Sequence, residues 1–163
     1  MSTMVVNPRT GLKLGAVLRQ AWVGYRRRLD EELTAAGFGD HGFPDGRVLR
    51  ICASSELPTI ARIGRELGIS RQGAGKIVAS LRERGYVTVS ASTTNGREKV
   101  VALTPRAYDY LAAHRRASRR IEAQLRRDLG TEAFDGLLRI HGALDGDEQP
   151  ALRDYLRSAD LLG

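Results

Sequence analysis

The 163-residue sequence contains one cysteine and three histidines, and this scarcity removes several classes of function. A single cysteine, Cys52, excludes an intramolecular disulfide and any zinc site built from several cysteines. The histidines, His41, His114 and His141, are too scattered for a recognisable metal-binding motif. We therefore expect no metal site and no cofactor.

Long apolar runs are also missing. No segment approaches the roughly 20 apolar residues of a membrane-spanning helix, and residues 1–10 lack the apolar core of a signal peptide. No nucleophile–base pair and no phosphate-binding glycine loop is apparent, which argues against an enzyme. The expectation is a cytoplasmic protein that makes no contact with a membrane.

Basic charge is abundant, and it is unevenly distributed. The formal net charge is +7. Residues 62–99 contain eight basic and three acidic side chains, whereas residues 130–163 contain three basic and seven acidic ones. A basic surface favours a polyanionic partner such as nucleic acid. The middle of the chain is therefore the predicted contact surface.

Hydrophobic periodicity divides the chain into three parts. Residues 11–36 are predicted to form a helix with apolar residues at steps of three and four, namely Leu14, Leu18, Trp22, Tyr25, Leu29 and Leu33. Residues 44–104 form a central lobe, and residues 105–162 form further helices, the last over 151–162. A central lobe of about 60 residues cannot cover the apolar stripes of both flanking parts, so we expect 11–36 and 105–162 to build a homodimer.

The central lobe has the pattern of a helix-turn-helix followed by a hairpin. Thr59 and Ser70 are suited to cap two short helices, and Gly68 to make the tight turn between them. Gly85 ends the second helix, and two alternating runs, 86–90 and 99–103, then flank an Asn-Gly turn signal. The predicted fold is mainly α (α+β): a winged helix-turn-helix with a two-stranded wing, flanked by N- and C-terminal dimerisation helices.

The second of these helices is predicted to enter the major groove of double-stranded DNA. On its polar side an arginine can read guanine, a glutamine can read adenine and a lysine suits a phosphate, while a glycine permits close approach. Basic residues after the hairpin turn can reach the minor groove. The predicted DNA-contacting residues are Ser70, Arg71, Gln72, Gly75, Lys76, Arg97 and Lys99.

Three segments resemble the multiple-antibiotic-resistance regulator (MarR) family: LGISR at 67–71, LRERGYV at 81–87 and NGREKVVALT at 95–104. The resemblance implies a symmetric dimer built by the first and the C-terminal helices. It also implies repression of a nearby promoter, often relieved by a small phenolic or other anionic ligand. Arg97 falls on the wing arginine of the family, and Asn95 stands where the family usually has an aspartate that forms a salt bridge with it.

Several interpretations stay open on sequence alone. Trp22, Tyr25 and Arg26 are candidates for binding an anionic or aromatic effector, and the two aromatic residues also suit a dimer core. The family's peroxide sensors place their reactive cysteine in the first helix, so Cys52, on an apolar stripe, is expected to be a structural thiol. A low-specificity architectural DNA-binding protein and a winged-helix protein-interaction module remain alternatives to a sequence-specific regulator.

Overall fold

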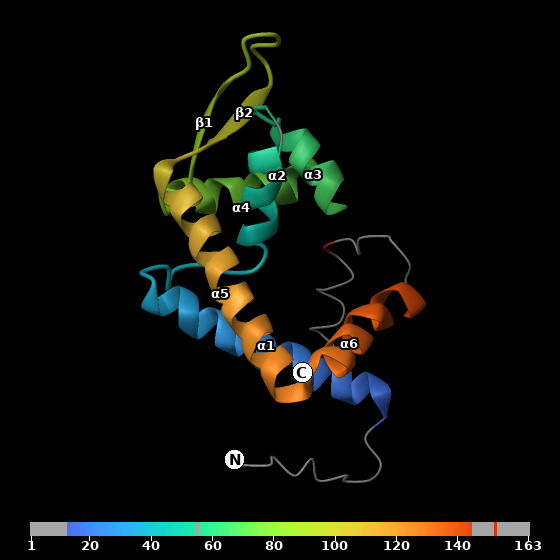
Figure 1. Cartoon of the computed structure of the whole chain (residues 1–163). Coiled ribbons are helices and arrows are strands. Elements are labelled where there is room, and N and C mark those ends of the chain that lie inside the picture. Colours follow the sequence, from blue (N-terminus) through green and yellow to red (C-terminus); the bar gives the residue numbers. More distant parts are fainter. Residues whose placement is uncertain (1–12, 55, 145–151, 153–163) are drawn as a thin grey trace.

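A computed structural model describes residues 13–54, 56–144 and 152 of the chain, and the described part contains six helices and two strands. The elements are α1 (Leu14–Ala35), α2 (Asp45–Ser54), α3 (Ile60–Leu67), α4 (Arg71–Glu83), β1 (Val87–Ala91), β2 (Lys99–Leu103), α5 (Pro105–Leu129) and α6 (Thr131–Leu144). Helices α2, α3 and α4 and the two strands form a lobe at one end of α5, which α1 crosses (Figure 1). This is the predicted winged helix architecture.

The local signals that predicted the helix-turn-helix are satisfied in the structure. The Thr59 hydroxyl accepts a hydrogen bond from the Arg62 amide at 3.2 Å, and the Ser70 hydroxyl accepts one from the Gly73 amide at 3.1 Å. Both caps pair amides that have no partner within their own helix. Gly68 adopts a left-handed φ of 69° between the two helices, a conformation that costs glycine least.

The close crossing of α3 and α4 depends on Gly64, which the sequence analysis did not single out. A Cβ atom at this buried position would lie 3.1 Å from the Ile69 carbonyl oxygen and 3.4 Å from the Ala74 Cβ. The first of these neighbours belongs to the backbone of the turn and has little freedom to move. Gly64 therefore fixes how closely the second helix packs on the first.

The hairpin forms the wing, and its two strands follow the predicted alternating runs closely. Val87 pairs with Leu103 and Val89 with Val101 in an antiparallel register, and β1 begins at Val87, one residue later than predicted. The tip spans residues 92–98 and is closed by the Ser92 amide, which donates to the Glu98 carbonyl at 2.8 Å. A further backbone bond, from the Val101 amide to the Pro58 carbonyl at 3.0 Å, ties the wing to the start of α3.

The apolar stripe of α1 serves two purposes. Leu29 and Leu33 are buried in the chain's own core, which also contains residues of α5. Nearer its start, by contrast, α1 leaves large apolar side chains exposed: Leu14, Val17, Trp22 and Val23. Only part of the stripe is therefore left to contact a second molecule.

Helix α6 likewise carries both buried and exposed apolar side chains. Phe134 is buried, whereas Leu137, Leu138 and Leu144 are exposed. The helix predicted over 151–162 lies outside the described residues except for Leu152, which is helical and buried. In the described part of the chain, no helix is both long and apolar enough to cross a membrane.

We expect the Gly64→Ala substitution to destabilise the protein by about 1–3 kcal/mol, since the added methyl group presses on the backbone of the turn. Urea unfolding followed by circular dichroism measures this change. The control is Gly24→Ala in α1, where an added Cβ meets nothing within 4 Å. There the change should raise stability by up to about 1 kcal/mol through helix propensity. Equal effects at both sites would contradict the role given to Gly64.

Candidate nucleic-acid interface and cavity

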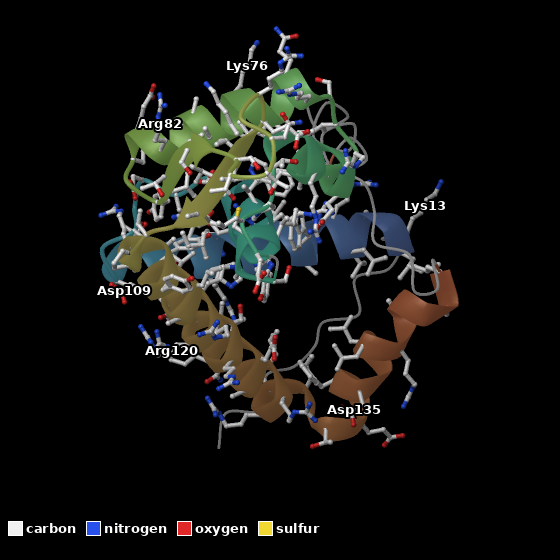
Figure 2. All side chains as sticks on the ribbon, turned by 90° about the horizontal axis from the view of Figure 1, so that it is seen from above. Lys13, Lys76, Arg82, Asp109, Arg120 and Asp135 are labelled. Atoms are coloured by element: carbon white, nitrogen blue, oxygen red, sulfur yellow. The ribbon has the colours of Figure 1, made fainter. Side chains whose placement is uncertain are left out.

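Helix α4 has one buried face and one uncovered face. Its inner face carries Ala74, Val78 and Leu81, which are at most 1% exposed. Its outer face carries the exposed side chains of Arg71, Gln72, Lys76 and Arg82. Lys76 and Arg82 point away from the rest of the protein (Figure 2). The predicted division of this helix into a core face and a polar face is therefore present.

Two small residues shape the start of this face. The Ser70 hydroxyl oxygen is engaged as the helix cap, but a hydroxyl that accepts a bond can still donate its own proton, for example to a phosphate. At Gly75 an added Cβ would meet only Ile60 Cγ2, at 4.0 Å. Packing within the chain therefore does not require glycine at this position. The absence of a side chain leaves room for another molecule to approach the backbone of α4 closely.

The wing adds a second basic element beside α4 (Figure 1). Arg97 and Lys99 are exposed. The Asn95 carboxamide oxygen accepts a hydrogen bond from the Arg97 backbone amide at 3.2 Å, so it shapes the turn. Among the described residues no carboxylate lies within ion-pair distance of the Arg97 side chain. The wing arginine is thus held by its backbone and not by a salt bridge.

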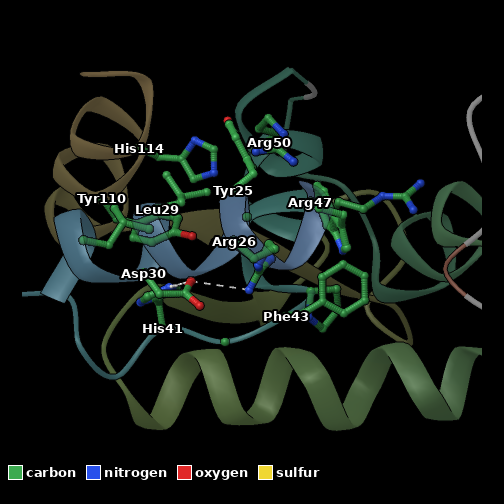
Figure 3. Close-up of a pocket in the computed structure, with 15 residues that line it drawn as sticks. Tyr25, Arg26, Leu29, Asp30, His41, Phe43, Arg47, Arg50, Tyr110 and His114 are labelled. Carbon is green, nitrogen blue, oxygen red and sulfur yellow. Dashed lines mark hydrogen bonds and ion pairs between the residues drawn. The ribbon is translucent and has the colours of Figure 1, made fainter. Parts of the chain in front are cut away.

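A cavity of about 180 Å³ lies between α1, the segment 41–47, α2 and α5. The three residues predicted to bind an effector, Trp22, Tyr25 and Arg26, all line it. Figure 3 shows Tyr25 and Arg26 on α1 facing residues from the other elements. The structure therefore brings these three residues to one cavity.

Aromatic rings and a guanidinium group form one wall of the cavity. The rings of Trp22 and Tyr25 stack with centroids 6.1 Å apart. The guanidinium carbon of Arg26 lies 5.9 Å from the Trp22 ring and 5.9 Å from the Phe43 ring. An ion pair with Asp30 at 3.5 Å anchors Arg26. Such a wall suits a flat ring with a negative charge.

Two histidines, His41 and His114, line the cavity in different surroundings. His41 bonds through Nδ1 to the Phe38 carbonyl at 2.6 Å and through Nε2 to Asp30 at 2.9 Å. Burial lowers the pKa of His114, and the positive charges of Arg50, Arg26 and His41 lower it further. His114 is therefore a neutral group in positive surroundings.

The sequence analysis missed several of the cavity residues: His41, Arg47, Arg50, Tyr110 and His114. They come from the loop after α1, from α2 and from α5, and no spacing in the sequence links these segments. Among the described residues that line the cavity there are three arginines, Arg26, Arg47 and Arg50, and one carboxylate, that of Asp30. This excess of positive charge favours an anion.

Cys52 lies in α2 with its side chain in the core. Burial raises the pKa of its thiol to about 11, and the negative charge of Glu66 contributes in the same direction. A cysteine reacts with oxidants as the thiolate. At neutral pH the group is held as an unreactive thiol, in line with the structural role expected for it.

Known proteins share this architecture. Residues 42–98 match the sequence model of the MarR family. A transcriptional repressor, CouR, bound to a 23-mer DNA duplex is similar in structure, with a TM-score of 0.64 and 22% identity over 83% of this chain and 99% of that one. A probable transcriptional regulator from Pseudomonas aeruginosa has a TM-score of 0.57 and 25% identity over 78% of this chain and 95% of that one.

A third similar structure contains a small ligand. It is a MarR family protein of Mycobacterium tuberculosis in complex with salicylic acid, with a TM-score of 0.57 and 21% identity over 82% of this chain and 97% of that one. Among curated protein sequences none matches the chain.

The environment of His114 predicts a measurable titration. Its pKa should lie below the ordinary value of about 6.5, and Arg50→Gln should raise it by removing a nearby positive charge. NMR titration of the imidazole protons measures both. Because the unfolded chain then binds a proton more readily than the folded one, this group lowers stability as the pH falls through the interval between the two pKa values. Arg116→Gln, an exposed change on the same helix, should leave the His114 pKa unchanged, and an equal shift in both variants would contradict the assignment.

Proposed function

We propose, from the match of residues 42–98 to the MarR family model, that the chain is a homodimeric, sequence-specific repressor whose binding to DNA is relieved by a small anionic effector. In this proposal residues 44–104 form the DNA-binding lobe. The flanking parts, 11–36 and 105–162, form the dimer. The protein acts by binding and not as an enzyme.

One observation carries the proposal: the basic outer face of α4 is uncovered while its opposite face is buried. A helix fixed in this way can enter a major groove with Arg71 and Gln72 at its leading end, where base edges are within reach. The wing places Arg97 and Lys99 beside it, within reach of an adjacent minor groove. Two copies related by a dyad would read a pseudo-palindromic operator with half-site centres about 10 base pairs apart.

The exposed apolar side chains of α1 and α6 support the dimer. Val23 is 56% exposed and Leu138 is 58% exposed. A monomeric protein rarely leaves several such residues uncovered along two helices. Association of the N- and C-terminal helices of two chains would remove them from water and would set the spacing of the two recognition helices.

The cavity supports a small aromatic anion as the effector. A cavity of about 150 Å³ holds a molecule of the size of benzene, and the one beside Trp22, Tyr25 and Arg26 has about 180 Å³. Its three arginines would attract a carboxylate or phenolate. The salicylic acid bound to the similar mycobacterial protein is of this class. An effector that binds the DNA-free form better releases the operator by linkage.

The DNA-reading roles predict different losses for two variants. Arg71→Ala should weaken operator binding by about 1–3 kcal/mol and relax the preference at one base pair. Arg97→Ala should weaken operator binding by a smaller amount. The size of this effect should depend on the A·T content of the duplex, because the minor groove carries a degenerate code. Fluorescence anisotropy with a duplex from the region upstream of the protein's own gene, and with a scrambled duplex, measures both at two salt concentrations.

These titrations also separate the alternatives. Equal affinity of the wild type for operator and scrambled DNA would favour an architectural protein, and no affinity for either would favour a protein-interaction module. If Arg71→Ala weakens both duplexes equally, this residue does not read bases. Asn95→Asp should tighten binding where pre-ordering of Arg97 outweighs the added negative charge.

The dimer predicts a second result. Leu138→Glu should weaken self-association at least about tenfold, because the interface would then bury an unpaired carboxylate. Sedimentation equilibrium at micromolar concentration measures the change. Tyr108→Glu is the matched control, since Tyr108 is equally exposed at 58% but lies near the start of α5 beside the winged lobe. A wild-type chain that sediments as a monomer would exclude the proposed dimer.

A further inference from the structure

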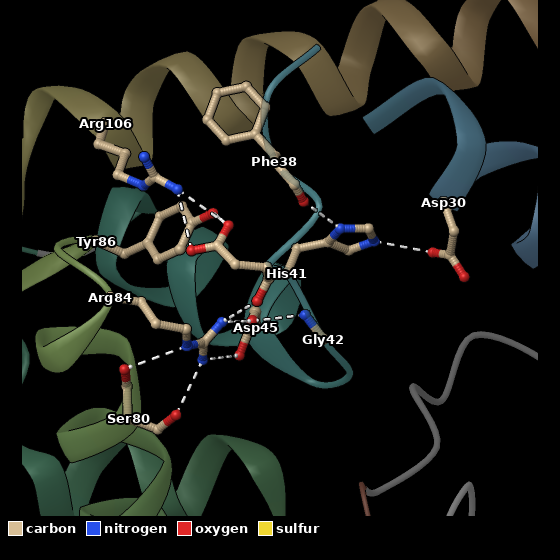
Figure 4. Close-up of polar contacts among 10 residues, drawn as sticks. Asp30, Phe38, His41, Gly42, Asp45, Ser80, Arg84, Tyr86 and Arg106 are labelled. Atoms are coloured by element: carbon tan, nitrogen blue, oxygen red, sulfur yellow. Dashed lines mark hydrogen bonds and ion pairs between the residues drawn. The ribbon is translucent and has the colours of Figure 1, made fainter. Parts of the chain in front are cut away.

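The segment 40–45 contacts both the cavity and the winged helix-turn-helix lobe. Its inner residues, 41–44, line the cavity. The residues at its ends, Asp40 and Asp45, instead bind side chains at the end of α4, the start of β1 and the start of α5 (Figure 4). A chain of four residues between two anchored ends has little freedom to shift without moving those ends.

Asp45 holds the end of the recognition helix. Its carboxylate, in a residue that is 4% exposed, accepts two hydrogen bonds from the Arg84 guanidinium, at 2.6 Å and 3.1 Å. Arg84 is the residue that caps the C-terminus of α4. The same guanidinium donates to the Ser80 carbonyl at 3.3 Å, to the Ser80 hydroxyl at 3.2 Å and to the Asp40 carbonyl at 2.9 Å. One side chain thus links the last turn of α4 to both ends of the segment.

Asp40 holds the start of the wing and of α5. It accepts a hydrogen bond from the Tyr86 hydroxyl at 2.7 Å and two from Arg106 at 3.0 Å. Burial would raise the pKa of Asp40, but the bond from Tyr86 and the charge and bonds of Arg106 together lower it. The carboxylate therefore stays ionised, and the contact persists at neutral pH.

The segment is also anchored to α1. His41, one residue after Asp40, bonds to Asp30 of α1 at 2.9 Å. In addition, the Gly42 amide donates to Asp45 at 2.8 Å, which folds the segment back on its own carboxylate. A molecule that enters the cavity and contacts residues 41–44 therefore acts on groups bonded to α1 on one side and to α4 on the other.

We propose that the Asp45–Arg84 pair couples the cavity to the recognition helix, so that a ligand touching residues 41–44 changes the position of α4 through this pair. The inference rests on the proposed function, because it assigns the route by which the effector acts. Asp45 and Arg84 are positioning residues: neither lines the outer face of α4, and neither is needed to hold the ligand. Two parallel hydrogen bonds between a guanidinium and a carboxylate fix both the distance and the orientation of the two groups, so a displacement of Asp45 is passed on to Arg84.

Trp22 permits a test in which ligand binding and DNA binding are measured independently. It is the single tryptophan of the chain and lines the cavity, so quenching of its fluorescence by salicylate reports ligand affinity without DNA. Anisotropy of the labelled upstream duplex, with and without saturating salicylate, gives the ratio of the two DNA affinities. That ratio is the coupling between the sites, for which factors of about 5 to 150 are typical.

The first test variant is Arg84→Lys, which keeps the positive charge but cannot form the paired hydrogen bonds of a guanidinium. The second is Asp45→Asn, and Asp135→Asn is its matched control. Asp135 pairs with Arg126 at 3.1 Å between α5 and α6, away from the segment. We expect both test variants to reduce the coupling ratio at least about threefold while salicylate affinity changes less than about twofold. The control should keep the wild-type ratio. Thermal unfolding establishes that each protein is folded, and Arg84→Lys, whose side chain is 24% exposed, is the milder change.

A purely structural role would lower the melting temperature and leave the coupling ratio unchanged, and this result would overturn the proposal while the proposed function stands. If salicylate quenches Trp22 but does not weaken operator binding in the wild type, the coupling does not exist and the proposal fails. If salicylate does not quench Trp22, the effector part of the proposed function fails, and the coupling fails with it. An absence of operator binding would reject the proposed function itself.

Discussion

A buried carboxylate has to be paired, and in this protein the pairing of Asp45 with Arg84 is the charged contact that joins the start of α2 to the end of α4. Removing one partner from such a pair leaves an uncompensated charge and typically costs about 3–5 kcal/mol. The pair joins the first residue of α2 to the last turn of α4, so the recognition helix is fixed by charge at its end as well as by apolar packing along its inner face. The hydrogen bonds of Asp40 with Tyr86 and Arg106 add further contacts between the same segment and the lobe.

The cavity lies where α1, α2 and α5 meet, and none of its described lining residues belongs to the DNA-facing helix α4, so a ligand can influence α4 only through residues between them. The inner face of α4 packs into the same core that Leu29 and Leu33 of α1 enter. Packed interiors yield little to small displacements and shift between discrete arrangements. A polar, hydrogen-bonded segment at the edge of that core is easier to move than the core itself. The concentration of charged contacts in residues 40–45 fits this physical requirement.

Much of the fold could be predicted from the sequence because its signals are local. The caps Thr59 and Ser70 act on amides three residues away, and Gly68 acts on its own backbone. Val87 and Val89 alternate along the first strand and pair with Leu103 and Val101, as the period of two in the sequence predicts. The polar outer face of α4 followed from helical periodicity alone. In each case the deciding interaction spans a few residues, so the sequence order is sufficient to recognise it.

The remaining features depend on residues that are distant in sequence, and only the tertiary structure decided them. Gly64 reads as an ordinary helical glycine until the carbonyl of Ile69 is placed 3.1 Å from its missing Cβ. The cavity needs residues of α1, α2 and α5, and Asp45 meets Arg84 across 39 positions of the chain. The stripe of α1 also looks uniform in sequence, yet Leu29 is buried and Leu14 is exposed, because only part of the helix packs into the chain's own core. A sequence specifies which side chains are available for such contacts, and the packing of the helices determines which of them meet.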